Sequence, residues 1–236
     1  MKIALLGYGK MGKAIEQIAL ERGHEITAKI NSRTPLESFD WSLVDVCIEF
    51  TQPQLALKHI AFCAQRQVPI VVGTTAWLSD LPAAKAHIES HDSALLHASN
   101  FSVGVNLFFE INKTLAALMS KHPKYEVSLN EIHHTQKKDA PSGTAITLAE
   151  QVIDALPNKT KWVNEASNDA SDLVILSERI DPAPGTHTTT YTSAIDDIQI
   201  THTAHNRKGF AGGALLAAEF AATHRGVFSM KEVLGL

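Results

Sequence analysis

Apolar and polar residues alternate with two different periods along the first half of the chain. Five short apolar runs predict buried strands, at residues 2–6, 25–30, 45–50, 69–73 and 94–98. Between them, apolar residues recur at helical spacing, at residues 11–19, 54–66 and 82–91. Gly23 follows the first of these segments, where a helix ends. Strands that alternate with helices favour a Rossmann-like, doubly wound parallel sheet of the α/β class.

The second half of the chain has a different pattern. A long amphipathic helix is expected at 103–121, a strand at 125–133 and a second helix at 144–156. Residues 157–171 are polar and indicate a loop. Three segments rich in Thr, Ile, Val and Tyr then predict consecutive antiparallel strands, at 173–180, 186–193 and 197–203. An Ala-rich helix is expected at 209–224.

These patterns indicate two domains. The α/β half gives way to an α+β half with a mixed or antiparallel sheet near residues 102–104, and the last helix is expected to return to the first domain. The predicted division is residues 1–103 with 208–236, and residues 104–207.

A glycine-rich loop, Gly7-x-Gly9-x-x-Gly12, joins the first predicted strand to the first helix. In dinucleotide-binding folds the first glycine allows the tight turn, the second lets a pyrophosphate approach, and the third lets the helix pack closely. The helix N-terminus offers N–H groups to phosphates. The alternative is a tight turn with no ligand. Its position at the start of a βαβ unit favours nucleotide binding.

The acidic residue that usually follows the second strand and binds the ribose of NAD is missing. The chain reads Asn31-Ser32-Arg33 there. Arg33 is suited to a 2′-phosphate, which makes NADPH, NADH or both candidate cofactors. The alternative is that Arg33 is a solvated loop charge.

Three further segments follow predicted strands at the edge where such sheets bind ligands. They are Glu49-Phe50-Thr51, Gly73-Thr74-Thr75 and Ser99-Asn100-Phe101-Ser102. Each alone would suggest an ordinary turn, but three at one edge favour a pocket for ribose and nicotinamide.

Composition narrows the functional classes. The 236 residues are 44% hydrophobic and 19% charged, which is typical of a globular protein. The net charge of −4 shows no basic excess for nucleic acid or an anionic membrane. We expect a cytoplasmic protein, because no apolar run is long enough to span a bilayer and no signal sequence is evident. Cys47 and Cys63 are expected to be core thiols.

The densest cluster of reactive residues runs from Glu131 to Ala145. Two adjacent histidines, His133 and His134, end a strand and should face opposite sides. Lys137 follows in a turn, and Ser142-Gly143-Thr144 begins a helix whose N–H groups and hydroxyls can bind a carboxylate. This arrangement favours a proton donor acting on an anionic substrate. The alternatives are a metal-binding histidine pair or two surface histidines. We expect no metal, because adjacent histidines do not easily share one ion.

The whole chain resembles the 4-hydroxy-tetrahydrodipicolinate reductase (dihydrodipicolinate reductase) family. Residues 131–145 match the family signature E-x-H-H-x-x-K-x-D-x-P-S-G-T-A at every fixed position. The glycine loop, Gly73-Thr74-Thr75, the run from Ala98 to Asn106 and His205-Asn206-Arg207 also match. The chain is short for the family around its second strand.

The resemblance implies NAD(P)H-dependent reduction of a cyclic dicarboxylate that bears an imine, in lysine biosynthesis. It implies hydride delivery to C4, His133 as proton donor to C3, and Lys137 as its assistant. The implied substrate-binding residues are His134, Ser142, Gly143, Thr144, Thr75 and Arg207, although Arg207 is equally interpretable as a surface charge. The implied cofactor-binding residues are Gly7, Tyr8, Gly9, Lys10, Met11, Gly12, Asn31, Ser32, Arg33, Phe50, Thr51, Gly73, Thr74, Thr75, Ala98, Ser99, Asn100 and Phe101.

The family resemblance also implies a dinucleotide-binding domain, and a second domain that binds substrate, closes over it and forms a homotetramer through its sheet. Two other hypotheses remain. One is a different NAD(P)-dependent enzyme, such as an amino-acid or semialdehyde dehydrogenase, although a semialdehyde dehydrogenase needs a nucleophilic cysteine. The other is a dinucleotide sensor without catalysis.

Overall fold

The computed structural model describes residues 1–206 and 208–236. The chain divides into two compact units, Met1–Val103 with Lys208–Leu236, and Gly104–Arg207. These are the boundaries expected from the sequence, whereas the functional role of each unit stays a prediction. In the part of the chain that the structure describes, no helix is both long and apolar enough to cross a membrane.

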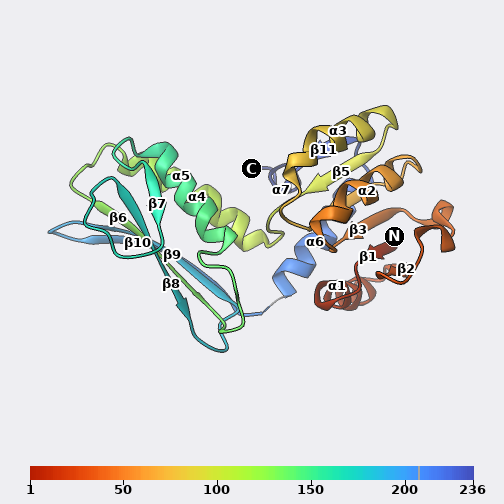
Figure 1. Cartoon of the computed structure of the whole chain (residues 1–236), viewed down its shortest axis with the longest axis horizontal. Helices are drawn as coiled ribbons and strands as arrows, with labels where there is room; N and C mark the ends of the chain where they lie inside the picture. The colour runs from red at the N-terminus through yellow and green to blue at the C-terminus, as the bar shows by residue number, and fades with distance from the viewer. Residues whose placement is uncertain (207) are drawn as a thin grey trace. The chain divides into compact units, whose positions relative to one another are not determined.

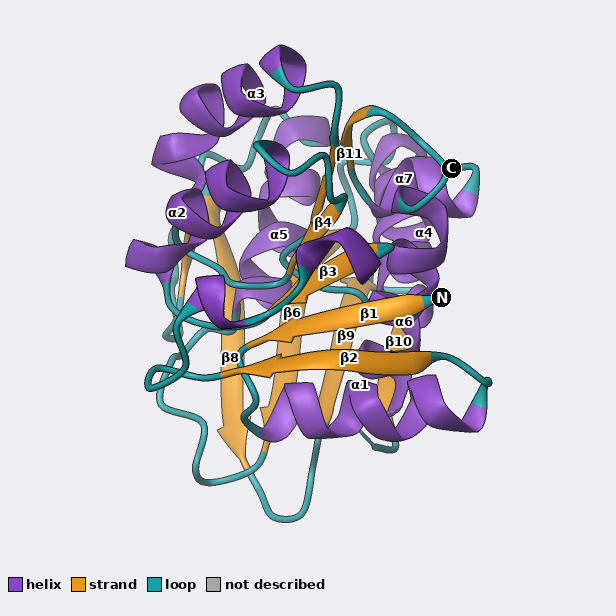
Figure 2. Ribbon diagram, turned by 90° about the vertical axis from the view of Figure 1, so that its right-hand side faces the viewer, coloured by secondary structure: helices purple, strands orange, loops and turns teal. Residues whose placement is uncertain are grey.

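The first unit contains a six-stranded sheet whose hydrogen-bonded pairs are all parallel (Figures 1 and 2). Its strands are β1 (Lys2–Leu6), β2 (Glu25–Ile30), β3 (Val46–Glu49), β4 (Ile70–Val72), β5 (Ala94–His97) and β11 (Gly226–Phe228), in the order β11-β5-β4-β3-β1-β2. Its helices are α1 (Lys10–Glu21), α2 (Pro53–Ala64), α3 (Leu81–Ser90), α6 (Lys208–Ala221) and α7 (Met230–Leu234). Single 3-10 turns lie at Leu36–Ser38, Trp41–Leu43 and Leu78–Asp80.

Both faces of this sheet are buried because its strands are apolar at successive positions. Ala4 and Leu6 of β1 pack with residues of α2 and α3, whereas Ile3 and Leu5 pack with residues of α1 and α6. Successive strand residues point to opposite faces, so a run of apolar residues supplies two cores at once. The doubly wound sheet predicted from the sequence is therefore confirmed, and α6 belongs to this unit as expected.

The second unit contains a five-stranded mixed sheet in the order β10-β9-β6-β8-β7. Its elements are α4 (Val103–Met119), β6 (Glu126–His133), α5 (Gly143–Ala155), β7 (Lys161–Val163), β8 (Asp172–Arg179), β9 (Gly185–Thr192) and β10 (Asp197–Ala204). Residues of α4 and α5 form one core with inward residues of the strands, among them Leu129, Ile175 and Tyr191. The opposite face of the sheet is polar and partly or fully exposed, with Ser128, Thr188, Thr190, Gln199 and Thr201.

Three predictions about elements were wrong or incomplete. The strands after residue 171 are not three adjacent antiparallel strands, because β6 lies between β8 and β9 and pairs with β8 in parallel. The segment expected to be a loop at residues 157–171 contains β7, which adds to the edge of the sheet beside β8. Strand β11 and helix α7 were not predicted, because each is only a few residues long.

Candidate active site

The glycine loop of the first unit has a separate physical role for each glycine. Gly7 adopts φ +93°, and a Cβ there would lie 1.9 Å from the Phe50 carbonyl oxygen. A Cβ on Gly12 would lie 2.3 Å from the carbonyl oxygen of Gly7. A Cβ on Gly9 would meet no described atom within 4 Å, so the loop is open beside Gly9 alone. No described side chain caps α1 at Gly9, which leaves the first N–H groups of the helix available to an anion.

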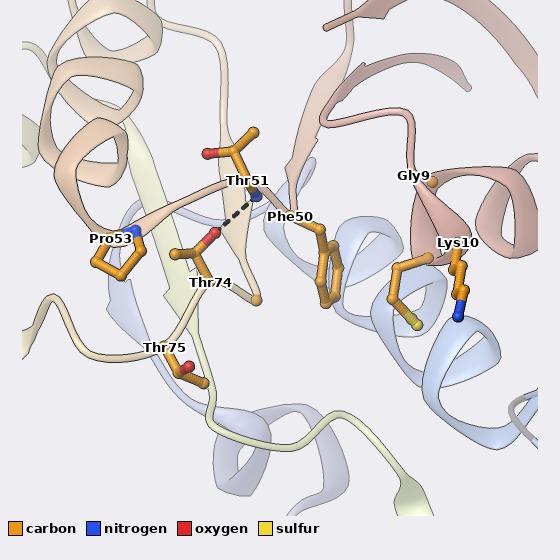
Figure 3. A pocket seen from close by; sticks show the side chains of 10 residues that line it. Gly9, Lys10, Phe50, Thr51, Pro53, Thr74 and Thr75 are labelled. Atoms are coloured by element: carbon orange, nitrogen blue, oxygen red, sulfur yellow. Dashed lines mark hydrogen bonds between the residues drawn. The ribbon is translucent and has the colours of Figure 1, made fainter. Parts of the chain in front are cut away.

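A cavity of about 370 Å³ opens beside this loop at the carboxyl ends of the strands (Figure 3). Most of its lining belongs to segments predicted from the sequence: Gly9, Lys10, Met11, Gly12, Phe50, Thr51, Gly73, Thr74 and Thr75. Pro53 also lines it and was not predicted. The Thr74 hydroxyl accepts a 2.8 Å hydrogen bond from the Thr51 N–H, which ties two strand ends together. The Phe50 ring lies between these threonines and the start of α1 in Figure 3.

A buried carboxylate lies behind the rim of this cavity. Glu49 ends β3 with no exposed surface, and its Oε1 accepts a hydrogen bond from the Thr51 hydroxyl. The same oxygen is 3.2 Å from Nδ1 of His59, a buried residue of α2. The Glu49–His59 pair therefore fixes the loop that carries Phe50 and Thr51. The sequence showed Glu49 at the strand end, but it did not indicate His59.

The other predicted cofactor residues are not part of the cavity lining. Tyr8 donates a hydrogen bond to Glu16, and the Lys29 ammonium lies 5.2 Å from its ring centre. Phe101 is buried, with its ring centre 5.8 Å from that of Phe50. Ala98 is half-buried, Ser99 is exposed, and Asn100 accepts a hydrogen bond from the Ser102 N–H.

The turn expected to bind the 2′-phosphate follows β2. The Asn31 side chain accepts hydrogen bonds from the Arg33 N–H at 2.9 Å and from the Thr34 hydroxyl at 3.2 Å. All of Asn31, Ser32 and Arg33 are exposed. Asn31 therefore shapes this turn, and the Arg33 side chain extends from it toward solvent.

In the second unit, sheet register brings polar residues of three strands into one row. Glu131 of β6 pairs with His187 of β9 on one side and with Ser177 of β8 on the other. His133, two residues further along β6, pairs with Arg179 of β8. These residues continue the inward face of the sheet that carries the apolar core at Leu129. The strand end is thus polar where the rest of the inward face is apolar.

Glu131 is fully buried and is the centre of this polar row. The Ser142 N–H donates to both of its oxygens at 3.1 Å, the Ser177 hydroxyl donates at 2.8 Å, and Arg179 lies 3.3 Å from Oε1. Burial opposes ionisation, but the hydrogen bonds, led by that from His133, outweigh it and hold the pKa of Glu131 well below its usual range. The carboxylate therefore stays charged at neutral pH.

His133 lies within this polar row rather than at the surface. Its Nε2 is 3.4 Å from Oε2 of Glu131 and 3.3 Å from Nε2 of His187, and its Nδ1 is 3.3 Å from the Pro184 carbonyl oxygen. A Cβ on Gly185 would come within 2.8 Å of the ring, so a glycine is needed beside it. The role of His133 as proton donor remains a prediction.

The predicted substrate-binding residues near α5 differ in orientation. Lys137 forms two hydrogen bonds to Asp139, at 2.8 and 2.9 Å, and His134 is half-buried. Ser142 is buried and caps α5, because its hydroxyl accepts the Ala145 N–H at 3.2 Å. Its side chain therefore faces inward.

Gly143 is exposed and Thr144 is half-buried at the start of the helix. Thr75 lies in the first unit, in the cavity lining. Arg207 lies outside the described residues.

His187 is the main residue that sequence reasoning missed. It is buried, its Nε2 is 3.0 Å from the Ser142 hydroxyl and 3.7 Å from Glu131, and burial lowers its pKa. Its signal was an alternating pattern in β9, where Gly185, His187, Thr189 and Tyr191 are buried in turn. The pattern identifies an inward histidine, but only register places it beside Glu131.

One ligand atom each from Glu131, His133 and His187 lie within 4.8 Å of one another. A cation could be held by such a set, so any metal site here would pair His133 with His187 and not with the adjacent His134.

Comparison with protein families identifies two matches that together cover nearly the whole chain. The family model described as "Dihydrodipicolinate reductase, N-terminus" matches residues 1–101. The one described as "Dihydrodipicolinate reductase, C-terminus" matches residues 104–234.

Known relatives carry the same description. A 4-hydroxy-tetrahydrodipicolinate reductase from Christiangramia forsetii is 46% identical over 235 residues, which is 99% of this chain and 98% of the relative. One from Neisseria meningitidis serogroup C is 36% identical over 199 residues, 81% of this chain and 73% of the relative.

The fold is similar to a dipicolinate-bound dihydrodipicolinate reductase from Paenisporosarcina sp. TG-14, with a TM-score of 0.78, 23% identity and 97% of each chain covered. Aspartate semialdehyde dehydrogenase II from Vibrio cholerae is less similar, with a TM-score of 0.51, 14% identity, and 92% of this chain and 97% of that chain covered.

Proposed function

This chain belongs to the dihydrodipicolinate reductase family, and from that premise we propose that it reduces 4-hydroxy-tetrahydrodipicolinate, via dihydrodipicolinate, to tetrahydrodipicolinate with NAD(P)H. This reaction belongs to the diaminopimelate route to lysine. The observation that carries the proposal is the 46% identity to a reductase of that description over 99% of the chain. The geometry of each unit supports one half of the reaction.

The first unit is suited to a pyridine nucleotide. The open side of Gly9 and the uncapped start of α1 fit a pyrophosphate, and the cavity between α1 and the Thr51–Thr74 pair fits the ribose and nicotinamide. The cofactor supplies a hydride when bound. Lys10, which is exposed at the cavity edge, and Arg33 are the cations that we assign to the 2′-phosphate of NADPH. The turn at residues 31–33 holds no carboxylate that would repel it, so we propose that both NADPH and NADH are used.

The second unit supplies the proton and binds the substrate. His133 gives one proton to ring carbon C3 while hydride adds to C4, so that the conjugated double bond is reduced and His133 becomes neutral. Lys137 and the N-terminal turn of α5, with the exposed Gly143 and the half-buried Thr144, are assigned to the substrate carboxylates, and His134 is assigned to the same site. We assign Ser142 a supporting role, because its hydroxyl and its N–H face His187 and Glu131.

We propose that the protein is a cytoplasmic homotetramer. The polar face of the second unit's sheet carries the exposed apolar residue Leu176 among its threonines, which suits pairing with another copy. Cys47 and Cys63 are free and buried, which is compatible with a reducing compartment.

A semialdehyde dehydrogenase mechanism is not supported by the cysteines. Both are fully buried, and burial raises the pKa of Cys47 well above its usual value, so neither is an accessible thiolate.

The test is cofactor oxidation, followed by absorbance, with substrate made in situ from pyruvate and aspartate semialdehyde by the preceding synthase. We expect turnover with NADPH and NADH. Protein that binds a nucleotide but turns over neither cofactor would contradict the proposal and favour a sensor or a different dehydrogenase.

A further inference from the structure

The polar row of the second unit contains more polar side chains than a proton donor needs. A single histidine can carry a proton from solvent to a substrate. Here the His133 ring is largely buried, and a buried ring must find partners for its nitrogens in both of its protonation states. Leaving a buried nitrogen without a partner in either state would oppose proton release or uptake.

The neutral state of His133 is satisfied by His187. Nδ1 of His133 faces the Pro184 carbonyl oxygen, which can only accept, so the neutral ring carries its proton on Nδ1. Its Nε2 is then an acceptor, 3.3 Å from Nε2 of His187. Nδ1 of His187 has no partner among the described residues, and burial lowers the pKa of His187, so that ring is neutral with its proton on Nε2. His187 can therefore donate to His133.

The protonated state of His133 is satisfied by Glu131. The added proton lies on Nε2 of His133, 3.4 Å from Oε2 of Glu131. The N–H of His187 can then turn to the Ser142 hydroxyl, 3.0 Å away. No buried group of the cluster loses its partner when the proton is added or removed.

We propose that Glu131 and His187 are positioning residues that let His133 gain and lose one proton inside the fold. Glu131 accepts a hydrogen bond from the protonated ring, and His187 donates one to the neutral ring. The inference rests on the proposed function, in which His133 releases that proton to the substrate and regains it from solvent.

The charged groups around this cluster come from several elements. Besides Glu131 of β6, they are Arg179 of β8 and the Lys137–Asp139 pair in the loop before α5. The first turn of α5 carries no acidic residue. Glu131 is therefore the carboxylate that contacts His133, and changing it should change the proton affinity of the ring directly.

The spacing of the three ligand atoms could also hold a divalent cation. The hydrogen bonds favour a proton. Arg179 and the Ser177 hydroxyl already occupy Oε1 of Glu131, and the Ser142 N–H contacts both oxygens, so the carboxylate is balanced without an ion. Treatment with a chelator distinguishes a bound proton from a bound cation. If these residues hold only a proton, the protein keeps its activity after dialysis against EDTA.

The test compares the pH profile of kcat in two variants, which should move in opposite directions. A general acid must be protonated, so wild-type kcat falls at high pH. Glu131→Gln removes the charge that stabilises the protonated ring, and the fall should move to lower pH by about one to three units. His187→Phe keeps the ring shape but removes the donor to the neutral ring, so the fall should move to higher pH by about half a unit or more.

The matched control is His202→Gln. His202 lies opposite His187 on β10, its Nδ1 also lacks a partner among the described residues, and its ring packs near Phe108 instead. Its pH profile should stay as in wild type. His187→Gln, which keeps an N–H donor, should restore part of the profile that His187→Phe loses. The KM for NADPH should stay constant throughout, because the cofactor cavity is in the first unit.

If the substitutions only damaged the structure, kcat would fall in both variants, but their pH profiles would not move in opposite directions. Unmoved profiles in both variants, or two displacements in the same direction, would overturn the inference. So would loss of activity on chelation with recovery on adding Zn²⁺.

If the wild-type protein does not turn over, the proposed function fails, and ¹⁵N spectra of histidine-labelled protein still test the cluster. They should show His187 neutral with its proton on Nε2 near neutral pH, with signals that change in Glu131→Gln. A doubly protonated His187 would contradict the inference.

Discussion

At the scale of single residues, replacing the proton donor should affect turnover and not cofactor binding. His133→Gln keeps a polar side chain but cannot deliver a proton, so kcat should fall by about 10²-fold or more. The measurement is steady-state kinetics together with NADPH titration. An unchanged kcat would remove His133 from the mechanism.

The sequence identified the chemical types of the site residues, but not all of their partners. The histidines, the lysine and the capping serine near residue 142 were all recognised in one contiguous segment. His187 was not, because its partnership with Glu131 depends on strand register, which brings together residues 56 positions apart. His59 was missed for the same reason, since it meets Glu49 only when α2 packs on β3. Contacts across elements carry no local signal.

The exposed arginine after β2 should discriminate between the two cofactors. Arg33→Ala removes a cation that we assign to the 2′-phosphate, so the Kd for NADPH should rise by about tenfold while the Kd for NADH changes little. Fluorescence titration with each cofactor measures this. Equal effects on both would mean that Arg33 does not contact that phosphate.

Glu131 should make the stability of the fold depend on pH in the acidic range. Its pKa is lower in the folded state than the ordinary value of 4.5, so its contribution to the free energy of unfolding is complete above that value and is lost as the pH falls below it. The free energy of unfolding, measured with urea, should therefore fall between about pH 5 and pH 3. The fall should be about 1–3 kcal/mol larger for the wild type than for Glu131→Gln. A variant with the same slope as wild type would contradict this linkage.

At the scale of elements, the sequence predicted the strands and helices that have a long apolar pattern. It did not predict short strands or the order of strands, which depend on tertiary pairing. The parallel sheet of the first unit was correct because each strand is apolar on both faces. Strands β7 and β11 have three residues each, too few for a period to show. The position of β6 between β8 and β9 could not be predicted, because alternation marks the buried face of a strand and not its neighbours.

The close packing of α1 on the glycine loop should be sensitive to one methyl group. Gly12→Ala would place a Cβ 2.3 Å from the Gly7 carbonyl oxygen and displace the start of α1, so the Kd for NADPH should rise by about tenfold or more. Gly212→Ala in α6 is the matched control, since among the described residues its Cβ would meet only the end of the Arg22 side chain, at 3.9 Å. That variant should bind NADPH normally, and titration calorimetry distinguishes the two.

At the scale of the whole molecule, the two hydrophobic cores of the first unit and the single core of the second have no residue in common in the described part of the chain. Family membership and the division of the chain followed from sequence, because the motifs and the change from α/β to α+β patterning are both local. We propose that the cofactor binds to one unit and that the proton donor belongs to the other. Because the cores are separate, the effect of a ligand on each unit can be tested.

Ligand binding should stabilise the two units unequally. NADPH at about 100 times its Kd should stabilise the first unit by about 2.7 kcal/mol, which raises its melting temperature by several degrees. Leu148→Ala, in the core of the second unit, should lower the other transition instead. Differential scanning calorimetry would show both. A single transition that NADPH and Leu148→Ala shift together would contradict the expectation of separate units.

The interruption of the first unit has a consequence for its synthesis. Helix α6 supplies buried alanines to one face of the first sheet, yet it comes after all of the second unit in the chain. On the ribosome, residues 104–206 emerge before α6, so the second unit can complete its core while the first sheet still exposes Ile3, Leu5 and Val71. The nucleotide cavity is therefore finished late in translation, and chaperones that cover nascent apolar surface would meet that uncovered face first.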